Sequence, residues 1–161
     1  MIYPNLVKNE GFEANLLEWN AVPGKDTAFL SSYKESLEGA GHAQTHFNGT
    51  LTQDINIRHL PPRTSFLLSF AVQGVGSARL DVRVEWLGKG GNPIGWGLNL
   101  SIPEGALSNQ GNYLTYLNTT FPSIPGAVAA RLVFTASVPN SSLFIRLDQM
   151  IFAPVLSTNL V

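Results

Sequence analysis

The stretch Ala78-Arg79-Leu80-Asp81-Val82-Arg83-Val84-Glu85-Trp86-Leu87 identifies the class of fold of this 161-residue chain. Apolar side chains occupy every second position, and charged side chains stand between them. Because successive side chains of a β-strand point to opposite faces, the pattern predicts a strand with one face in a core and the other in solvent. Glycine-rich segments at residues 74–77 and 88–93 predict a turn before the strand and a loop after it.

The same two-residue period recurs on both sides of this strand. In the preceding segment, Phe66, Leu68, Phe70 and Val72 fall on one face of an expected strand. Further segments alternate in the same way at residues 113–121, 128–136 and 143–152. We count eight to ten expected strands without a crossover helix, so the sequence predicts an all-β antiparallel sandwich. No repeat or linker divides residues 1–161, which we expect to form a single domain.

Two local features are expected in the first third of the chain. Residues 43–47 and 50–57 flank Asn48-Gly49, a dipeptide typical of two-residue hairpins, so these two segments are predicted to pair. Residues 31–38 are the one segment expected to form a helical turn, and Gly39 follows it.

The composition excludes several classes of function. Only 13% of the residues are charged, and the net charge is −1 with a pI near 6.3. Nucleic acid is therefore excluded as a partner, because phosphate binding needs a basic face. The chain contains no cysteine, which rules out disulfides and thiolate chemistry. No apolar run approaches the roughly 18 residues of a membrane span, so we expect no membrane partner.

Catalytic chemistry is not expected either. Asp81 and Glu85 share one face of a strand, but they lie about 13 Å apart at ~3.3 Å per residue. That distance is too long for a retaining glycosidase, and Arg83 stands between the two carboxylates. No motif of a nucleophilic serine is present. His42 and His46 have the same four-residue spacing in an expected strand, which is too far apart to bind one metal ion. We therefore predict that the chain is not an enzyme.

The two ends of the chain carry the motifs of a known family. The opening segment reads Asn9-Glu10-Gly11-Phe12-Glu13 and is followed by Trp19; the last long strand contains Asp148. Together with residues 49–55 and 125–134, these motifs resemble the jelly-roll carbohydrate-binding modules, a galactose-binding-like group attached to xylanases and glucanases. The resemblance implies a jelly-roll sandwich with Phe12 in its core. It also implies a bacterial, extracellular or surface protein, although no signal peptide is visible at residues 1–4.

The same resemblance implies a structural calcium ion held by Glu13 and Asp148. Calcium prefers carboxylate and carbonyl oxygens, and residues 38–41 could add carbonyl ligands. Gln149 stands where the family often has a second aspartate, which reduces the charge of the expected site. The alternative is that Glu13 caps a turn and that Asp148 pairs with an arginine.

The function implied by the family is non-catalytic glycan binding, on a concave sheet face or at a rim of loops. Sugar recognition needs aromatic rings for the apolar ring face and polar side chains for the hydroxyl groups. The aromatic candidates are Trp96, Tyr113 and Tyr116, whereas Trp19 and Trp86 are predicted to lie in the core. The polar candidates on outward strand positions are Gln73, Arg83, Glu85 and Arg131.

A second function remains open beside glycan binding. Similar domains precede collagen-like repeats in bacterial surface and spore-coat proteins, where a jelly roll would serve as a structural or trimerising head. The low charge and the apolar segment 151–156 favour this alternative. The sequence therefore leaves a carbohydrate partner and a homo-oligomer as the two expected associations.

Overall fold

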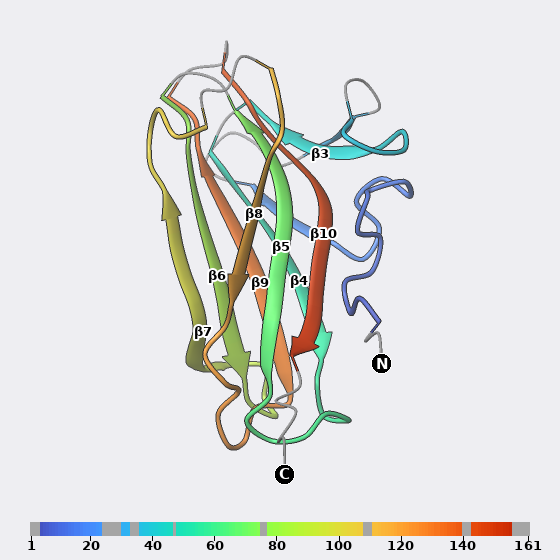
Figure 1. Ribbon diagram of the computed structural model, residues 1–161, viewed down its shortest axis with the longest axis vertical. Helices are drawn as coiled ribbons and strands as arrows, with labels where there is room; N and C mark the ends of the chain where they lie inside the picture. Colours follow the sequence, from blue (N-terminus) through green and yellow to red (C-terminus); the bar gives the residue numbers. More distant parts are fainter. Residues whose placement is uncertain are drawn as a thin grey trace.

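The computed structural model describes residues 4–23, 30–32, 36–46, 48–74, 77–107, 111–139 and 143–155. Within these ranges ten strands form two five-stranded antiparallel sheets that pack face to face (Figure 1). Sheet A contains, in spatial order, β1 (Asn20–Pro23), β4 (Gly49–Asn56), β9 (Ala129–Ser137), β6 (Arg79–Leu87) and β7 (Pro93–Ile102). Sheet B contains β2 (Leu30–Ser32), β3 (His42–Thr45), β10 (Ile145–Val155), β5 (Ser65–Gly74) and β8 (Leu114–Thr119). The predicted all-β antiparallel sandwich is confirmed.

The core lies between the two sheets and consists of the predicted alternate positions. On β6, Leu80, Val82, Val84 and Trp86 are fully buried, and on β5 so are Phe66, Leu68, Phe70 and Val72. Phe12 is also fully buried and lies against Trp19, with 5.3 Å between the ring centres. The prediction that Phe12, Trp19 and Trp86 belong to the core is therefore correct.

Gly97 of β7 allows the largest core side chain to fit. A Cβ atom at Gly97 would lie 2.5 Å from the six-membered ring of Trp86. Real Cβ atoms do not approach other atoms so closely, and the neighbour here is a rigid ring in a packed core. The glycine is therefore needed for sheet A to close over Trp86.

The predicted hairpin at Asn48-Gly49 is wrong. Strand β3 pairs with β2 and β10 in sheet B, whereas β4 pairs with β1 and β9 in sheet A. The chain thus passes from one sheet to the other at this point, and the side-chain oxygen of Asn48 accepts a hydrogen bond from the Val138 amide at 2.9 Å. A local turn signal shows where the chain reverses but does not decide which strand becomes the hydrogen-bonded neighbour.

The predicted helical turn is also wrong in the part that the structure describes. Residues 31–32 belong to β2, and residues 37–40 form bends; residues 33–35 of this prediction lie outside the described residues. The described ranges contain no helix, and so none that is long and apolar enough to cross a membrane.

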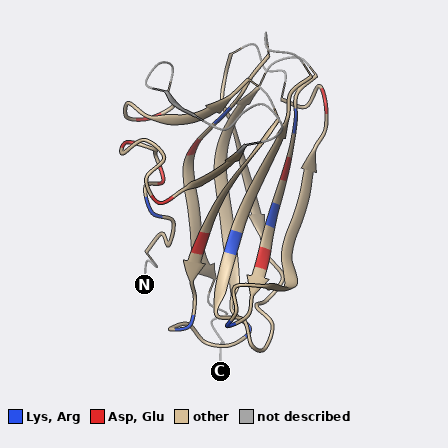
Figure 2. Cartoon of the chain, turned by 180° about the vertical axis from the view of Figure 1, so that it is seen from behind, with Lys and Arg blue, Asp and Glu red and all other residues tan. Residues whose placement is uncertain are grey.

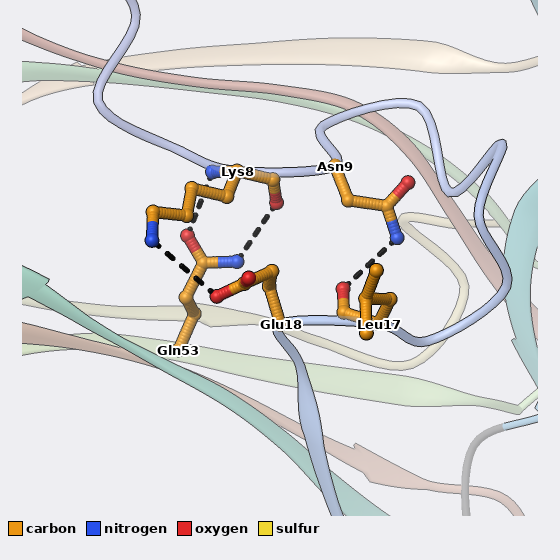
Figure 3. A network of polar contacts seen from close by, with 5 residues as sticks. All are labelled: Lys8, Asn9, Leu17, Glu18 and Gln53. Atoms are coloured by element: carbon orange, nitrogen blue, oxygen red, sulfur yellow. Dashed lines mark hydrogen bonds and ion pairs between the residues drawn. The ribbon is translucent and has the colours of Figure 1, made fainter.

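The segment before β1 joins the two sheets. Leu6 donates its amide hydrogen to the Phe152 carbonyl of β10 at 2.8 Å, and Met150 donates to the Glu10 carbonyl at 3.0 Å. On the other side, Gln53 of β4 makes two hydrogen bonds with the main chain of Lys8 (Figure 3). These contacts bring the opening motif beside the last strand, where the candidate site lies.

Candidate functional site

The structure divides the seven predicted sugar-binding residues among three places. Arg83, Glu85, Trp96 and Arg131 lie on the outer face of sheet A, which turns away from sheet B. Gln73 and Tyr113 line one hollow on the outer face of sheet B. Tyr116 stacks on Phe70, with 5.6 Å between the ring centres and 9° between the ring planes, and packs against the core. The seven residues therefore do not form one site.

On the outer face of sheet A, acidic and basic side chains lie beside one another on neighbouring strands. Asp54, Arg131, Glu85 and Trp96 stand side by side on four neighbouring strands, and acidic and basic positions alternate there (Figure 2). The Arg131 guanidinium donates two hydrogen bonds to Asp54, at 2.6 and 2.8 Å, and these bonds raise the pKa of Arg131 above its ordinary value. Each charge on this row thus has a neighbour of opposite sign.

Trp96 is the exposed aromatic side chain of that face. Its exposed fraction is 55%, so it is not part of the core. The guanidinium carbon of Arg83 lies 5.5 Å from the centre of its ring. Such a cation–π contact covers one face of the indole and contributes of the order of 0.5–1 kcal/mol at an exposed site.

The outer face of sheet B contains a groove, which we call the β5 groove. It consists of two hollows, of about 510 Å³ and about 1060 Å³, and outward side chains of β5 line both of them. Gln73 lines the smaller hollow; Ala71 and Ser69 line the larger one. Gln73 and Ala71 are two residues apart on one strand face, which corresponds to about 7 Å. The two hollows therefore border successive outward positions of the same strand.

Several of the side chains that line the larger hollow are small. Ser69 and Ala71 of β5, Thr115 of β8 and Ala153 of β10 line it, together with residues of the opening segment. None of these four side chains extends far from the sheet. The wall opposite them includes Gly11 and Glu13, so the segment that precedes β1 forms one side of the groove.

The smaller hollow contains a chain of hydrogen-bonded polar side chains. Arg146 of β10 donates from Nε to Gln44 Oε1 at 2.7 Å and from Nη1 to Gln73 Oε1 at 2.8 Å. Gln73 in turn donates from Nε2 to the Gly111 carbonyl. The Arg146 guanidinium carbon also lies 4.2 Å from the centre of the Phe144 ring. Polar and aromatic groups are thus held together at one end of the groove.

Sequence reasoning missed three residues of this network, namely Gln44, Phe144 and Arg146. The relevant signal was present in the last strand, where Arg146 occupies an outward position between the buried Ile145 and Leu147. Gln44 lies between two histidines in the sequence. Its strand has four residues, which is too short to show an alternation of apolar and polar positions. What the sequence could not indicate is that β3, β10 and β5 are neighbours.

Glu13 and Asp148, the predicted calcium ligands, lie close together beside the larger hollow. A Cβ atom at Gly11 would lie 3.8 Å from Glu13 Oε1 and 4.0 Å from Asp148 Oδ1. Asp148 is fully buried and accepts hydrogen bonds from the amides of Leu37, Glu38 and Gln149. Burial raises the pKa of Asp148 above its ordinary value, and these amide bonds offset part of the rise.

The surroundings of these two side chains bear on the predicted calcium site. Glu13 Oε1 accepts from the amides of Ala40 and Gly41 at 2.8 and 3.0 Å, so the loop at residues 37–41 presents N–H groups to both carboxylates. In the described part of the chain, no three His, Cys, Asp or Glu side chains form a group that could hold a metal ion. Two carboxylates, one of them buried, fit a hard cation, but the remaining ligands would be main-chain carbonyls or water.

Comparisons with known proteins identify the fold. Neither protein-family models nor curated protein sequences match the chain. Among solved structures, the enzymatically active domain of tailspike protein 4 from bacteriophage CBA120 has a TM-score of 0.73 and 20% identity; the match covers 94% of this chain and 21% of that one. The chain thus corresponds to about a fifth of the tailspike chain.

Two smaller proteins match over almost their whole length. A family 61 carbohydrate-binding module in complex with β-1,4-galactotriose has a TM-score of 0.69 and 14% identity, with 94% of this chain and 99% of the module covered. A family 22 xylan-binding domain from Paenibacillus barcinonensis has a TM-score of 0.66 and 14% identity, with 97% of each chain covered. At these identities the likeness establishes the fold, which is the jelly-roll sandwich of carbohydrate-binding modules, as the sequence motifs indicated.

Proposed function

We propose that this chain is a non-catalytic carbohydrate-binding domain that holds a neutral glycan in the β5 groove. The observation that carries the proposal is the polar and aromatic network at one end of the groove, in which Gln73 and Arg146 lie beside Phe144 and Tyr113. A carbohydrate partner and an extracellular or surface location belong to the same proposal.

The chemistry of the network suits a sugar. Hydroxyl groups both donate and accept, and the glutamine amide of Gln73 can do either. A pyranose also has an apolar C–H face, which packs on an aromatic ring. Phe144 and Tyr113 line the same hollow as Gln73 and Arg146, so both kinds of contact are available in one hollow.

The charge of the groove favours a neutral glycan. Four carboxylate side chains line the larger hollow, and no lysine or arginine of the described residues lines it. These four residues are Glu10, Glu13, Glu38 and Asp148. A polyuronate in the larger hollow would bring its carboxylates against these side chains, and charges of like sign repel each other strongly in a partly desolvated groove.

The carboxylates of the groove are also poorly arranged for glycosidic cleavage. A glycosidase uses one carboxyl group as an acid and another as a base or nucleophile on either side of the sugar bond. Glu13 and Asp148 instead accept hydrogen bonds from main-chain amides of the loop at residues 37–41. These bonds direct both groups toward the loop, which supports a binding function without catalysis.

The proposal is tested by isothermal titration calorimetry with β-1,4-galactotriose and with soluble xylan oligosaccharides. We expect binding of at least one probe by the wild type and a loss of roughly tenfold or more in affinity for Q73A and R146A, since each removes a polar group from the groove. W96A is the matched control, because Trp96 lies on the opposite sheet. No binding of either probe, or a loss for W96A alone, would overturn the assignment.

One observation favours a second function, that of an oligomerising head domain. The outermost strands β7 and β8 contain no charged residue, and exposed apolar side chains lie along this edge of the sandwich. They are Ile94, Trp96, Leu114, Leu117 and Phe121. Uncharged edges with exposed apolar groups invite association with further copies of the chain. Size-exclusion chromatography with light scattering tests this candidate, and a monomer at high concentration would remove it.

Calcium is proposed as a structural ion beside the groove, with Glu13 and Asp148 supplying carboxylate oxygens. The support is the closeness of the two carboxylates and the complete burial of Asp148, whose negative charge is costly to bury without a compensating cation. The ion would join the opening segment to the last strand and would take no part in chemistry.

A further inference from the structure

We propose that Gln44 and His46 are positioning residues for Arg146 and that they hold its guanidinium in the β5 groove only while His46 is uncharged. The proposal rests on the function proposed above, since it concerns the same groove. It makes glycan binding dependent on the charge of a side chain that lies outside the hollow itself.

The orientation of the Gln44 amide follows from its bond to Arg146. The Nε atom of Arg146 lies 2.7 Å from Gln44, and an arginine nitrogen can only donate. The Gln44 atom at this position must therefore be the carbonyl oxygen. Its Nε2 group, which can only donate, points to the other side, where it lies 2.7 Å from His46 Nε2.

The protonation state of His46 follows from two separate contacts. Because Gln44 Nε2 donates, His46 Nε2 must accept and cannot carry a hydrogen atom. At the other side of the ring, His46 Nδ1 lies 3.0 Å from the Leu143 carbonyl oxygen, so Nδ1 must donate. Both contacts require the same neutral tautomer, with the hydrogen atom on Nδ1.

A second proton on His46 would break this arrangement. Nε2–H and the Gln44 NH₂ group would then face each other as two donors at 2.7 Å. Gln44 could restore a bond to His46 by turning its amide, but its NH₂ group would then face Arg146 Nε–H. A turned amide removes the bond from Arg146 to Gln44, and an unturned one is pushed away from His46; either change weakens one of the contacts that hold Arg146 over the groove.

The charged and titratable groups around His46 reinforce this dependence. Arg146 of β10 lies on the far side of Gln44, and a charged His46 would add a second positive charge to the same chain of contacts. His42, on the same face of β3, has its Nε2 3.4 Å from Gln44 Oε1, and Asp148 of β10 interacts with His42. Phe144, which packs edge-on against the His46 ring, is uncharged.

The first test needs no sugar. Nuclear magnetic resonance of the ¹⁵N-labelled protein should show His46 with its hydrogen atom on Nδ1 near pH 8. On acidification to about pH 5, the range in which an imidazole becomes charged, the Arg146 Nε–H signal should shift together with the His46 ring signals. The proposal would be overturned by a hydrogen atom on His46 Nε2, or by an Arg146 Nε–H signal that stays unchanged while the His46 ring signals shift.

Two variants separate a positioning role from a merely structural one. In H46Q, the side-chain oxygen can accept from Gln44 at every pH, so the Arg146 Nε–H signal should remain and its response to acid should disappear. H59Q is the matched control, because His59 is exposed in the loop after β4, and this variant should retain the response of the wild type. An equal response in H46Q and H59Q would contradict the proposal.

Glycan binding provides the second readout. With whichever probe the wild type binds, β-1,4-galactotriose or a xylan oligosaccharide, we expect the affinity to fall roughly tenfold between about pH 8 and about pH 5 for the wild type and H59Q but not for H46Q. If the wild type binds neither sugar, the proposed function fails while the resonance experiment still decides the roles of Gln44 and His46. Equal acid sensitivity of H46Q and wild type would refute the link to binding.

Discussion

Gln53 makes two hydrogen bonds with the main chain of Lys8: its Oε1 accepts from the Lys8 amide at 2.9 Å, and its Nε2 donates to the Lys8 carbonyl at 2.9 Å (Figure 3). These two bonds have the pattern of the main-chain hydrogen bonds between neighbouring strands, and they replace such main-chain bonds at Lys8. Because Gln53 lies on β4 and the segment also bonds to β10, this side chain helps to connect the sheets.

The variant Q53A should destabilise the protein by about 1–3 kcal/mol, because the main-chain groups of Lys8 lose their partners in a partly buried position. Urea denaturation followed by tryptophan fluorescence measures the change. T52A, on the outward neighbour of the same strand, is the control and should change stability by less than about 0.5 kcal/mol. Equal effects in the two variants would contradict the role given to Gln53.

The variant G97A should also be destabilising, by about 1–3 kcal/mol, because the added methyl group would overlap the Trp86 ring. Thermal unfolding gives the measurement. Gly90 provides the comparison, since a Cβ atom there would meet only the end of the Asn92 side chain, at 3.3 Å. A normal melting temperature for G97A would mean that sheet A can move away from Trp86 at little cost.

Asp81 gives a pH dependence of stability with a definite sign. Its partial burial raises the pKa, but hydrogen bonds from Ser101 and Arg79 and the nearby arginine charges outweigh burial and leave the pKa below its ordinary value. A lowered pKa stabilises the folded state above the ordinary carboxyl pKa of about 3.9, and this contribution is lost as the pH falls through the folded value.

We therefore expect wild type to be more stable than D81N at about pH 6 and the difference to narrow below about pH 3.9. Urea unfolding over this pH range measures both proteins. E104Q, at an exposed position after β7, is the control and should follow the wild type throughout. A constant difference between wild type and D81N would show that the carboxyl charge is not the cause.

Calcium should raise the melting temperature, and a chelator should lower it, because a ligand that binds only the folded state stabilises that state. The variant E13Q should abolish this response, since it removes a carboxylate charge beside the buried Asp148. Differential scanning calorimetry with and without the ion gives the measurement. The same melting temperature under both conditions would contradict calcium binding. The hydrogen bonds from main-chain amides would then be what holds the carboxylates of Glu13 and Asp148 in place.

The sequence predicted which side chains enter the core better than it predicted which strands are neighbours. Alternation in β5 and β6 identified Phe66 and Trp86 correctly, because burial on one face depends only on the residues of the strand itself. The pairing of β3 with β10 depends instead on contacts between distant segments, and the local signal at Asn48-Gly49 pointed to the wrong partner.

The prediction of the candidate site was limited in the same way. Period-two alternation separates inward from outward positions, but it does not say to which sheet an outward residue belongs. Arg83 and Gln73 both satisfied the outward pattern, and the structure places them on opposite faces of the sandwich. The closeness of Glu13 and Asp148 was anticipated only through the family resemblance, since no periodicity relates residues so far apart.

The positions of β9 and β10 affect how this protein folds during its synthesis on the ribosome. Each is the middle strand of its sheet, and they are the last two strands among the described residues. Until β9 and β10 have been made, each sheet consists of two separate strand pairs, β1–β4 and β6–β7 in sheet A and β2–β3 and β5–β8 in sheet B, which the two central strands then join. Topologies in which such distant segments pair fold slowly and expose unpaired strands on the way. The step that joins the strand pairs therefore waits for β9 and β10, and a nascent chain stalled before β9 should remain sensitive to proteases.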